Sequence, residues 1–165
     1  MSHKRAITHL RKADPKLAAV IDAVGPCTFA PAEHMAHFTA ITRSIVFQQL
    51  SGKAASTIYN RFAALFDDET PVPHKLIDLS DEQMRAVGLS RQKIGYLRDL
   101  ATRVHTGDVP IDKLDELSDD DIITALTSIK GIGRWTAQMF LMFRLGRPDV
   151  LPDLDLGIKK GIQRA

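Results

Sequence analysis

Apolar side chains recur every three or four positions along most of the chain, which is the spacing of helices with one buried face. Runs of this kind occupy residues 14–24, 32–50, 52–66, 80–88, 90–107 and 118–129. No segment shows the sustained alternation of apolar and polar residues that is typical of a half-buried strand. The sequence therefore predicts an all-α fold.

Residues that start and stop helices stand at the ends of these runs. Asp14 precedes a proline, which suits the first position of a helix, and Gly107 follows the end of a long run. Ser80 and Gln83 have the spacing of a capping box, in which each side chain accepts a hydrogen bond from the other residue's main-chain N–H. The proline-containing segment 67–74 is predicted to be a loop.

Length and composition limit the class of protein. The 165 residues, 44% hydrophobic and 25% charged, are ordinary for one soluble globular domain, expected to span residues 1–165. No run approaches the roughly 20 apolar residues of a membrane span, and residues 1–5 lack the apolar stretch of a secretory signal. The net charge of +2 permits nucleic-acid binding without requiring it. The single cysteine, Cys27, excludes an internal disulfide and a cysteine-ligated metal site, and favours a reducing intracellular setting.

The most informative stretch is a predicted hairpin of two helices at about residues 122–144. One helix ends at Ile129-Lys130-Gly131-Ile132-Gly133, and the next begins at once near Arg134. Two glycines one residue apart permit positive φ and a tight reversal, and the second helix presents free N–H groups at its start. Such a turn can bind a phosphate group, although an ordinary αα-hairpin has the same glycine spacing. The following Thr136-Ala137 makes the pattern more specific.

Three motifs, taken in their order, resemble the helix–hairpin–helix DNA glycosylase superfamily. They are residues 44–55 (SIVFQQLSGKAA), residues 88–101 with Lys93 and Tyr96, and residues 126–137 followed by Asp155. Within that superfamily the sequence is most similar to the DNA-3-methyladenine glycosylase II family, over about residues 30–165. The resemblance implies a two-lobed helical fold with the active site in the cleft between the lobes. It also implies hydrolysis of the N-glycosidic bond of a damaged base.

The resemblance places the catalytic aspartate at Asp155, with Asp153 as the rival position two residues earlier. A fixed carboxylate can stabilise the positive charge that develops on the sugar as the bond breaks, and it can activate a water molecule. Asp155 precedes Leu-Gly-Ile-Lys and also suits the N-cap of a helix. The two roles are compatible, because a cap position holds the carboxylate in place.

Trp135, the only tryptophan of the chain, follows the hairpin glycines. A flipped base needs a flat wall to stack against, and a cationic alkylated base is attracted to an aromatic face. Lyase members of the superfamily carry a catalytic lysine at this position, and tryptophan cannot form a Schiff base. The resemblance therefore implies a monofunctional glycosylase that flips and excises alkylated purines of the 3-methyladenine or 7-methylguanine type. The alternative role of Trp135 is packing within the hairpin.

Residues that contact DNA are expected in two of the motifs. Gln49 and Leu50 are candidates for filling the gap left by a flipped base, although Leu50 could instead be a core residue and Gln49 could cap main chain. Helical spacing assigns Phe47 and Met139 to the core rather than to a pocket. The other expected DNA-binding residues are Lys53, Lys130, Gly131, Gly133 and Thr136.

No cofactor and no metal bound by side chains are expected. The carbonyls of Ile129 and Ile132 occupy the positions at which the superfamily holds a monovalent cation. The expected partner is double-stranded DNA containing alkylated bases, bound by a monomer that has no contact with a membrane. Such a protein is expected inside the cell, in the cytoplasm and nucleoid of a bacterium or in the nucleus of a eukaryote.

The chain ends ten positions after Asp155, whereas the family usually continues with further helices. We therefore expect either a C-terminally truncated form or a natural short form. Two other functions stay open at this point. A non-catalytic helix–hairpin–helix DNA-binding protein would need neither Asp155 nor Trp135, and a plain helical interaction domain would leave the order of the three motifs unexplained.

Overall fold

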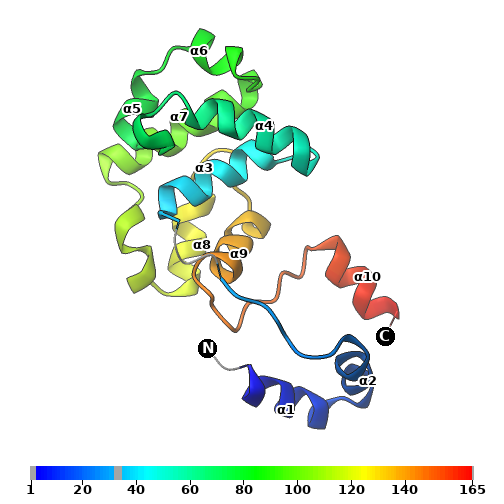
Figure 1. Ribbon diagram of the computed structural model, residues 1–165. Coiled ribbons are helices and arrows are strands. Elements are labelled where there is room, and N and C mark those ends of the chain that lie inside the picture. The colour runs from blue at the N-terminus through cyan, green and yellow to red at the C-terminus, as the bar shows by residue number, and fades with distance from the viewer. Residues whose placement is uncertain (1–2, 32–34, 165) are drawn as a thin grey trace. The chain divides into compact units, whose positions relative to one another are not determined.

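The computed structural model describes residues 3–31 and 35–164, and within these ranges the chain folds into helices and loops with no strand (Figure 1). The prediction of an all-α fold is confirmed for this part of the chain. The chain divides into two compact units, of which unit 1 comprises Met1–Ala30 with Leu151–Ala165 and unit 2 comprises Pro31–Val150. None of the described helices is both long enough and apolar enough to cross a membrane.

Unit 1 consists of α1 (Lys4–Ala13), α2 (Pro15–Val24) and α10 (Leu156–Arg164). Helix α1 packs against α2, and the side chain of Asp14 between them accepts hydrogen bonds from the N–H groups of Lys16 and Leu17, at 2.8 and 3.2 Å. These bonds confirm the predicted cap. The hydrophobic pattern does not predict α1, because this helix has no side-chain cap, no acid in its first turn and no buried residue.

Unit 2 contains seven described α-helices and two short 3₁₀ helices. They are α3 (His37–Phe47), α4 (Gly52–Ala63), η1 (Asp67–Glu69), α5 (Pro73–Asp78), α6 (Asp81–Ala86), α7 (Arg91–Thr106), η2 (Ile111–Glu116), α8 (Asp119–Thr127) and α9 (Arg134–Phe143). Helix α7 is the longest, and it contacts α3, α5 and α6. Helix α3 in turn contacts α4 and α9, and α9 packs against α8.

One hydrophobic core holds unit 2 together. Leu97 and Leu100 of α7 are fully buried, together with Ile45 of α3, Phe62 of α4 and Leu141 of α9. Burying a side chain of this size contributes about 1.5–3 kcal/mol relative to leaving it in water. The core therefore fixes α7 relative to α3 and α9, the helices whose ends form the site described below.

The predicted helix ends in unit 2 are mostly confirmed. Ser80 and Gln83 form the reciprocal capping box, with Ser80 N–H donating to Gln83 Oε1 at 2.8 Å and Gln83 N–H donating to Ser80 Oγ at 3.2 Å. Gly107 ends α7 with a left-handed φ of 83°. The predicted loop over residues 67–74 is wrong at its end, because Pro73 starts α5, and proline suits the first position of a helix.

The helix predicted from about Ala32 to Leu50 is shorter in the structure. Helix α3 begins at His37, and residues 32–34 of the predicted helix lie outside the described residues. At its other end α3 stops at Phe47, because Gln48 is extended (φ −52°, ψ 132°) and Gln49 has a left-handed φ of 57°. The helix thus ends three residues earlier than the hydrophobic pattern indicates, and the turn that follows forms part of the candidate site.

Candidate functional site

The turn between α8 and α9, residues 128–133, is called the hairpin turn below. Gly131 has a φ of +81°, which is the left-handed conformation that glycine adopts without steric cost. A Cβ atom built on Gly131 would lie 2.1 Å from Cδ2 of Tyr96, so the ring of Tyr96 packs directly on the main chain at this point. Both features require glycine at position 131.

Gly133 does not use the positive φ that a glycine permits. Its φ is −94° and its ψ is 171°, so it is extended and acts as the N-cap of α9. No heavy atom lies within 4 Å of a Cβ built there, apart from its immediate neighbours. One left-handed residue, Gly131, therefore suffices to reverse the chain. What Gly133 offers is open space next to the free N–H groups at the start of α9.

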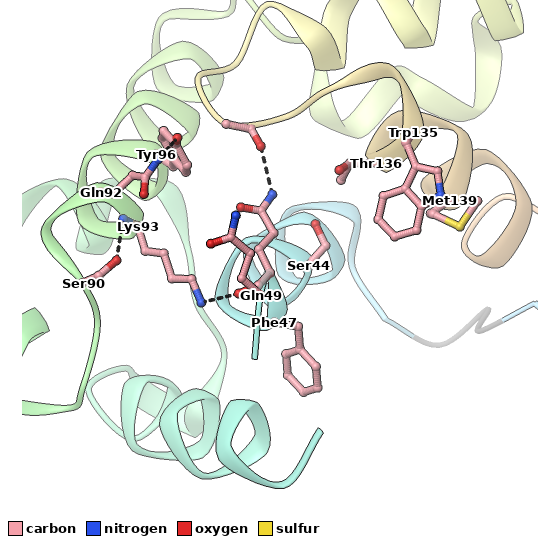
Figure 2. Close-up of a pocket in the computed structure, with 12 residues that line it drawn as sticks. Ser44, Phe47, Gln49, Ser90, Gln92, Lys93, Tyr96, Trp135, Thr136 and Met139 are labelled. Carbon is pink, nitrogen blue, oxygen red and sulfur yellow. Dashed lines mark hydrogen bonds between the residues drawn. The ribbon is translucent and has the colours of Figure 1, made fainter. Parts of the chain in front are cut away.

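Beside the hairpin turn lies a cavity of about 610 Å³. Figure 2 shows that α9 supplies one side of it with Trp135, Thr136 and Met139, and that α7 supplies another. The remaining wall comes from α3 and the turn that follows it. The lining residues are Ser44, Phe47, Gln48, Gln49, Ser90, Gln92, Lys93, Tyr96, Gly131, Trp135, Thr136 and Met139.

The wall on α9 is apolar and accessible. Trp135 lies in the first turn of α9, is 43% exposed and lines the cavity, and its role in a base pocket stays a prediction. Met139 lines the cavity, which corrects its assignment to the core, whereas Phe47 packs against the core and also lines the cavity. The guanidinium of Arg43 lies 3.9 Å from the ring centroid of Phe47, so a cation already stacks on that ring.

The turn after α3, residues 48–50, is called the Gln49 turn below. A left-handed conformation costs a residue other than glycine about 1–2 kcal/mol, so the φ of 57° at Gln49 must be held by its surroundings. Gln49 lines the cavity, and Leu50 is 38% exposed rather than part of the core. The two candidates for entering DNA therefore lie on a strained turn at the cavity edge.

A lysine from α7 holds the Gln49 turn. Lys93 Nζ donates hydrogen bonds to the carbonyl oxygens of Val46 at 2.6 Å and Gln48 at 2.9 Å. The last carbonyls of a helix lack partners within the helix, and a cation there is favoured by the helix dipole. Burial lowers the pKa of Lys93 below its ordinary value. Figure 2 shows the Lys93 side chain reaching across the cavity wall to this turn.

An aspartate from α7 holds the hairpin turn. Asp99 Oδ2 accepts a hydrogen bond from the main-chain N–H of Lys130 at 2.8 Å and another from Arg103 Nε at 2.9 Å. Burial raises the pKa of Asp99, but the Lys130 N–H and the Arg103 guanidinium outweigh it, so the pKa lies below its ordinary value. The side chain of Lys130 is 72% exposed, and its Nζ lies 3.9 Å from Asp99 Oδ1.

The two turns are also joined directly. The side-chain amide of Gln48 donates to the carbonyl oxygen of Gly131 at 2.9 Å, which Figure 2 shows as a dashed line. Lys53, in the first turn of α4, is exposed and is not among the residues that line the cavity. Of the predicted DNA-binding residues, the structure thus brings Gln49, Gly131 and Thr136 to one cavity.

The carbonyl positions proposed for a monovalent cation lie in the hairpin turn. The Ile129 carbonyl accepts a hydrogen bond from the Ile132 N–H at 3.1 Å, which closes the turn. A carbonyl oxygen has two lone pairs, so this bond leaves one acceptor position on Ile129 for a cation. The cation site stays a prediction.

Asp155 belongs to unit 1, directly before α10. Its Oδ1 accepts a hydrogen bond from the Ile158 N–H at 2.9 Å, and its carbonyl accepts one from the Lys159 N–H at 3.0 Å. The predicted N-cap at Asp155 is therefore confirmed, and it fixes the carboxylate relative to α10. Asp153 makes no such cap, and its N–H donates to the Leu151 carbonyl. The catalytic role of Asp155 stays a prediction.

Sequence reasoning missed the contribution of α7. Lys93 and Tyr96 belong to the motif at residues 88–101, but the sequence predicts no role for them. The sequence pattern does not indicate Asp99 as a site residue. One signal was available. These three residues stand at i, i+3 and i+6, so groups with polar atoms recur along α7 next to core residues such as Leu97.

Comparison with known proteins identifies the family. The model of the family described as "HhH-GPD superfamily base excision DNA repair protein" matches residues 42–165. The chain is 36% identical over 162 residues to DNA-3-methyladenine glycosylase 1 of Schizosaccharomyces pombe, an overlap that covers 95% of this chain and 70% of that protein. It is 32% identical over 160 residues to an alkylbase DNA glycosidase-like protein of the same yeast, covering 95% of this chain and 75% of that protein.

A solved structure agrees with the sequence relatives. The Schizosaccharomyces pombe 3-methyladenine DNA glycosylase, solved in complex with abasic DNA, superposes with a TM-score of 0.81 at 36% identity. The match covers 96% of this chain and 79% of that one. The chain therefore belongs to the HhH-GPD superfamily of base excision DNA repair proteins, and the family assignment made from the three motifs is confirmed.

Proposed function

We propose that this chain is a DNA glycosylase that flips alkylated purines out of duplex DNA and hydrolyses their N-glycosidic bonds, as a step of base excision repair. One observation carries the proposal: a cavity of about 610 Å³ opens beside the hairpin turn and is lined by Trp135. Sites for small molecules commonly enclose about 300–1,000 Å³. The relatives and the solved structure compared above, which are named as alkylbase or 3-methyladenine glycosylases, support it.

The cavity suits a cationic purine. Trp135 and Phe47 supply aromatic surface and Met139 supplies a polarisable thioether. An aromatic face attracts a cation by about 0.5–2 kcal/mol, depending on how far both are removed from water. Alkylation at a ring nitrogen gives the base a positive charge and makes it a better leaving group. One carboxylate can therefore suffice for the chemistry without a separate general acid.

The DNA would be held by the two turns. The open space at Gly133 and the free N–H groups at the start of α9 suit a phosphate group, and phosphate contacts position a protein on DNA without reading sequence. Gln49 and Leu50 would enter the duplex and replace the flipped nucleotide, as wedge side chains do in other proteins that distort DNA.

Asp155 is the proposed catalytic carboxylate, and its charge would stabilise the oxocarbenium-like sugar while the base departs. A monofunctional reaction is proposed because Trp135 cannot form a Schiff base. Among the residues that line the cavity, Lys93 alone carries an amine. Its Nζ donates to the carbonyl oxygens of Val46 and Gln48, so this side chain is engaged in holding the Gln49 turn.

The partner would be duplex DNA with alkylated bases, bound by a monomer, and the site of action would be wherever the cell keeps its DNA. The test uses a duplex oligonucleotide with one 7-methylguanine, incubated with the chain in chelator and then treated with alkali to cut abasic sites. A cut strand on a denaturing gel supports the proposal, and borohydride should leave no covalent adduct. Binding without base loss would instead favour a non-catalytic helix–hairpin–helix DNA-binding protein.

A further inference from the structure

One stripe of α7 contacts both turns that border the cavity. Lys93, Tyr96 and Asp99 follow one another at intervals of three residues, so they lie on successive turns of one helix side. Lys93 reaches the Gln49 turn, whereas Tyr96 and Asp99 reach the hairpin turn. These three residues are called the α7 stripe below.

Lys93 acts on the peptide group that controls the conformation of Gln49. Its second hydrogen bond is accepted by the carbonyl oxygen of Gln48, which belongs to the same rigid peptide plane as the Gln49 N–H. The φ angle of Gln49 is measured from this peptide plane, so a fixed plane restrains φ of Gln49. The left-handed φ of 57°, and with it the direction of the Gln49 side chain, therefore depends on the Lys93 ammonium.

The contacts form a closed circuit. From α7, Lys93 holds Gln48, and the side-chain amide of Gln48 donates to the Gly131 carbonyl. From Gly131 the circuit returns to α7 through the ring of Tyr96, and the neighbouring Lys130 N–H returns through Asp99. Buried apolar residues of the same helix, Leu97 and Leu100, anchor the circuit in the core of unit 2.

We propose that the α7 stripe fixes the spacing between the Gln49 turn and the hairpin turn, and that Lys93 is the positioning residue for the side chain that enters DNA. The proposal rests on the proposed function. Phosphates held at the hairpin turn set where the duplex lies, so a fixed spacing places Gln49 opposite the nucleotide to be flipped. Asp99 maintains the phosphate-binding part of the arrangement, and Lys93 maintains the inserting part.

The two roles separate in an experiment with duplex DNA that contains tetrahydrofuran, an uncleavable abasic analogue, next to 2-aminopurine. Fluorescence of 2-aminopurine rises when a protein side chain enters the stack and displaces it. Lys93→Met should abolish most of this rise and lower single-turnover excision tenfold or more, since a misplacement of about 1 Å can cost roughly 10²-fold. Binding to undamaged duplex should stay within about twofold, because phosphate contacts dominate it.

Matched variants distinguish positioning from a general loss of structure. Lys93→Arg should restore most of the fluorescence rise, because a guanidinium can also donate to two carbonyls. Lys113→Met, at an exposed position of η2, removes a lysine elsewhere in unit 2 and should behave like the chain without substitutions. If Lys93→Met does not fold, as judged by circular dichroism, Gln48→Met tests the spacing of the two turns, because it removes the side-chain bond to Gly131 and keeps the carbonyl that Lys93 binds; it should lower the fluorescence rise and excision by more than twofold.

Two outcomes would overturn the proposal. One is a folded Lys93→Met, or a folded Gln48→Met in its place, that keeps the fluorescence rise and excision within twofold. The other is an unchanged chain that produces no fluorescence rise on binding, because no side chain then enters the stack. The fluorescence measurement needs no base excision, so a chain without substitutions that gives the fluorescence rise but removes no base would refute the proposed function and leave the α7 stripe supported.

Discussion

The ring of Tyr96 lies directly against the main chain of Gly131, thirty-five positions later in the sequence. A Cβ atom at position 131 would come within 2.1 Å of the ring. Because Gly131 also has a φ of +81°, two independent constraints act on the same residue. The tight hairpin turn therefore depends on a helix that belongs to another part of the fold.

Gly131→Ala should lower the free energy of unfolding by about 2 kcal/mol or more, because the left-handed conformation costs about 1–2 kcal/mol and overpacking adds about 1–3. Urea unfolding followed by circular dichroism measures the change. Gly133→Ala is the matched control, since φ is −94° there and the space is open, and its effect should stay below about 1 kcal/mol. Equal stability of the two variants would contradict the Tyr96 contact.

Gly133→Val should weaken DNA binding without unfolding the chain. The added side chain would project into the open space where a phosphate is proposed to approach. Affinity should fall alike for undamaged and damaged duplex, and the dependence of binding on salt should become shallower because fewer counterions are released. Fluorescence anisotropy titrations at several salt concentrations measure both. A variant that binds undamaged duplex normally and loses only lesion discrimination would assign the hairpin turn to the base pocket.

The helix ends that could be predicted from the sequence are those set by contacts between residues close together in the chain. Asp14, Ser80 and Gln83 act on main chain within three residues, so their caps can be read directly from the sequence. The Gln49 turn could not be predicted in the same way. Its conformation is held by Lys93, whose acceptor on Gln48 is 45 positions away, and such a contact leaves no periodic pattern. A hydrophobic run therefore extended the predicted helix to Leu50.

In the candidate site, too, the residues with a local sequence signal were predictable and those held by long-range contacts were not. Trp135 and the N-cap at Asp155 follow from motif and local spacing, and the structure places the first in the cavity and confirms the second. Phe47 and Met139 have the helical spacing of core residues, and spacing alone does not tell a core face from a cavity wall. In the sequence Asp99 cannot be distinguished from a solvated acid on a helix, because its contact with the Lys130 N–H appears only in the structure.

Gln49→Gly should separate stability from function. Glycine adopts the left-handed φ at no steric cost, so the free energy of unfolding should stay the same or rise by up to about 1 kcal/mol. The side chain proposed to enter DNA is lost, so single-turnover excision should fall. Thermal melting and a quenched-flow or manual time course measure the two quantities. A clearly destabilised Gln49→Gly would mean that the Gln49 side chain itself holds the turn.

The Asp99 contact should make stability depend on pH in the acid range. The folded-state pKa of Asp99 lies below its ordinary value of 3.8, so its contribution is present above that pH and is lost as pH falls through the lowered pKa. Asp99→Asn should therefore cost about 1.5–3 kcal/mol near pH 7, the range for hydrogen bonds to charged groups. At a pH below the lowered pKa of Asp99 the two proteins should converge. Urea unfolding across this pH range measures the difference, and a constant gap would contradict the ionised contact.

Asp155→Asn should keep DNA binding and lose base excision. The asparagine oxygen can still accept the hydrogen bond from the Ile158 N–H, so α10 should keep its N-cap and the variant should fold. What disappears is the negative charge that would stabilise the oxocarbenium-like sugar, and the loss of one preorganised electrostatic group costs about 10²-fold or more in rate. Single-turnover cleavage of 7-methylguanine duplex gives the rate, and anisotropy gives the affinity. Asp153→Asn is the matched control and should stay near full activity. An active Asp155→Asn beside an inactive Asp153→Asn would move the catalytic role to Asp153.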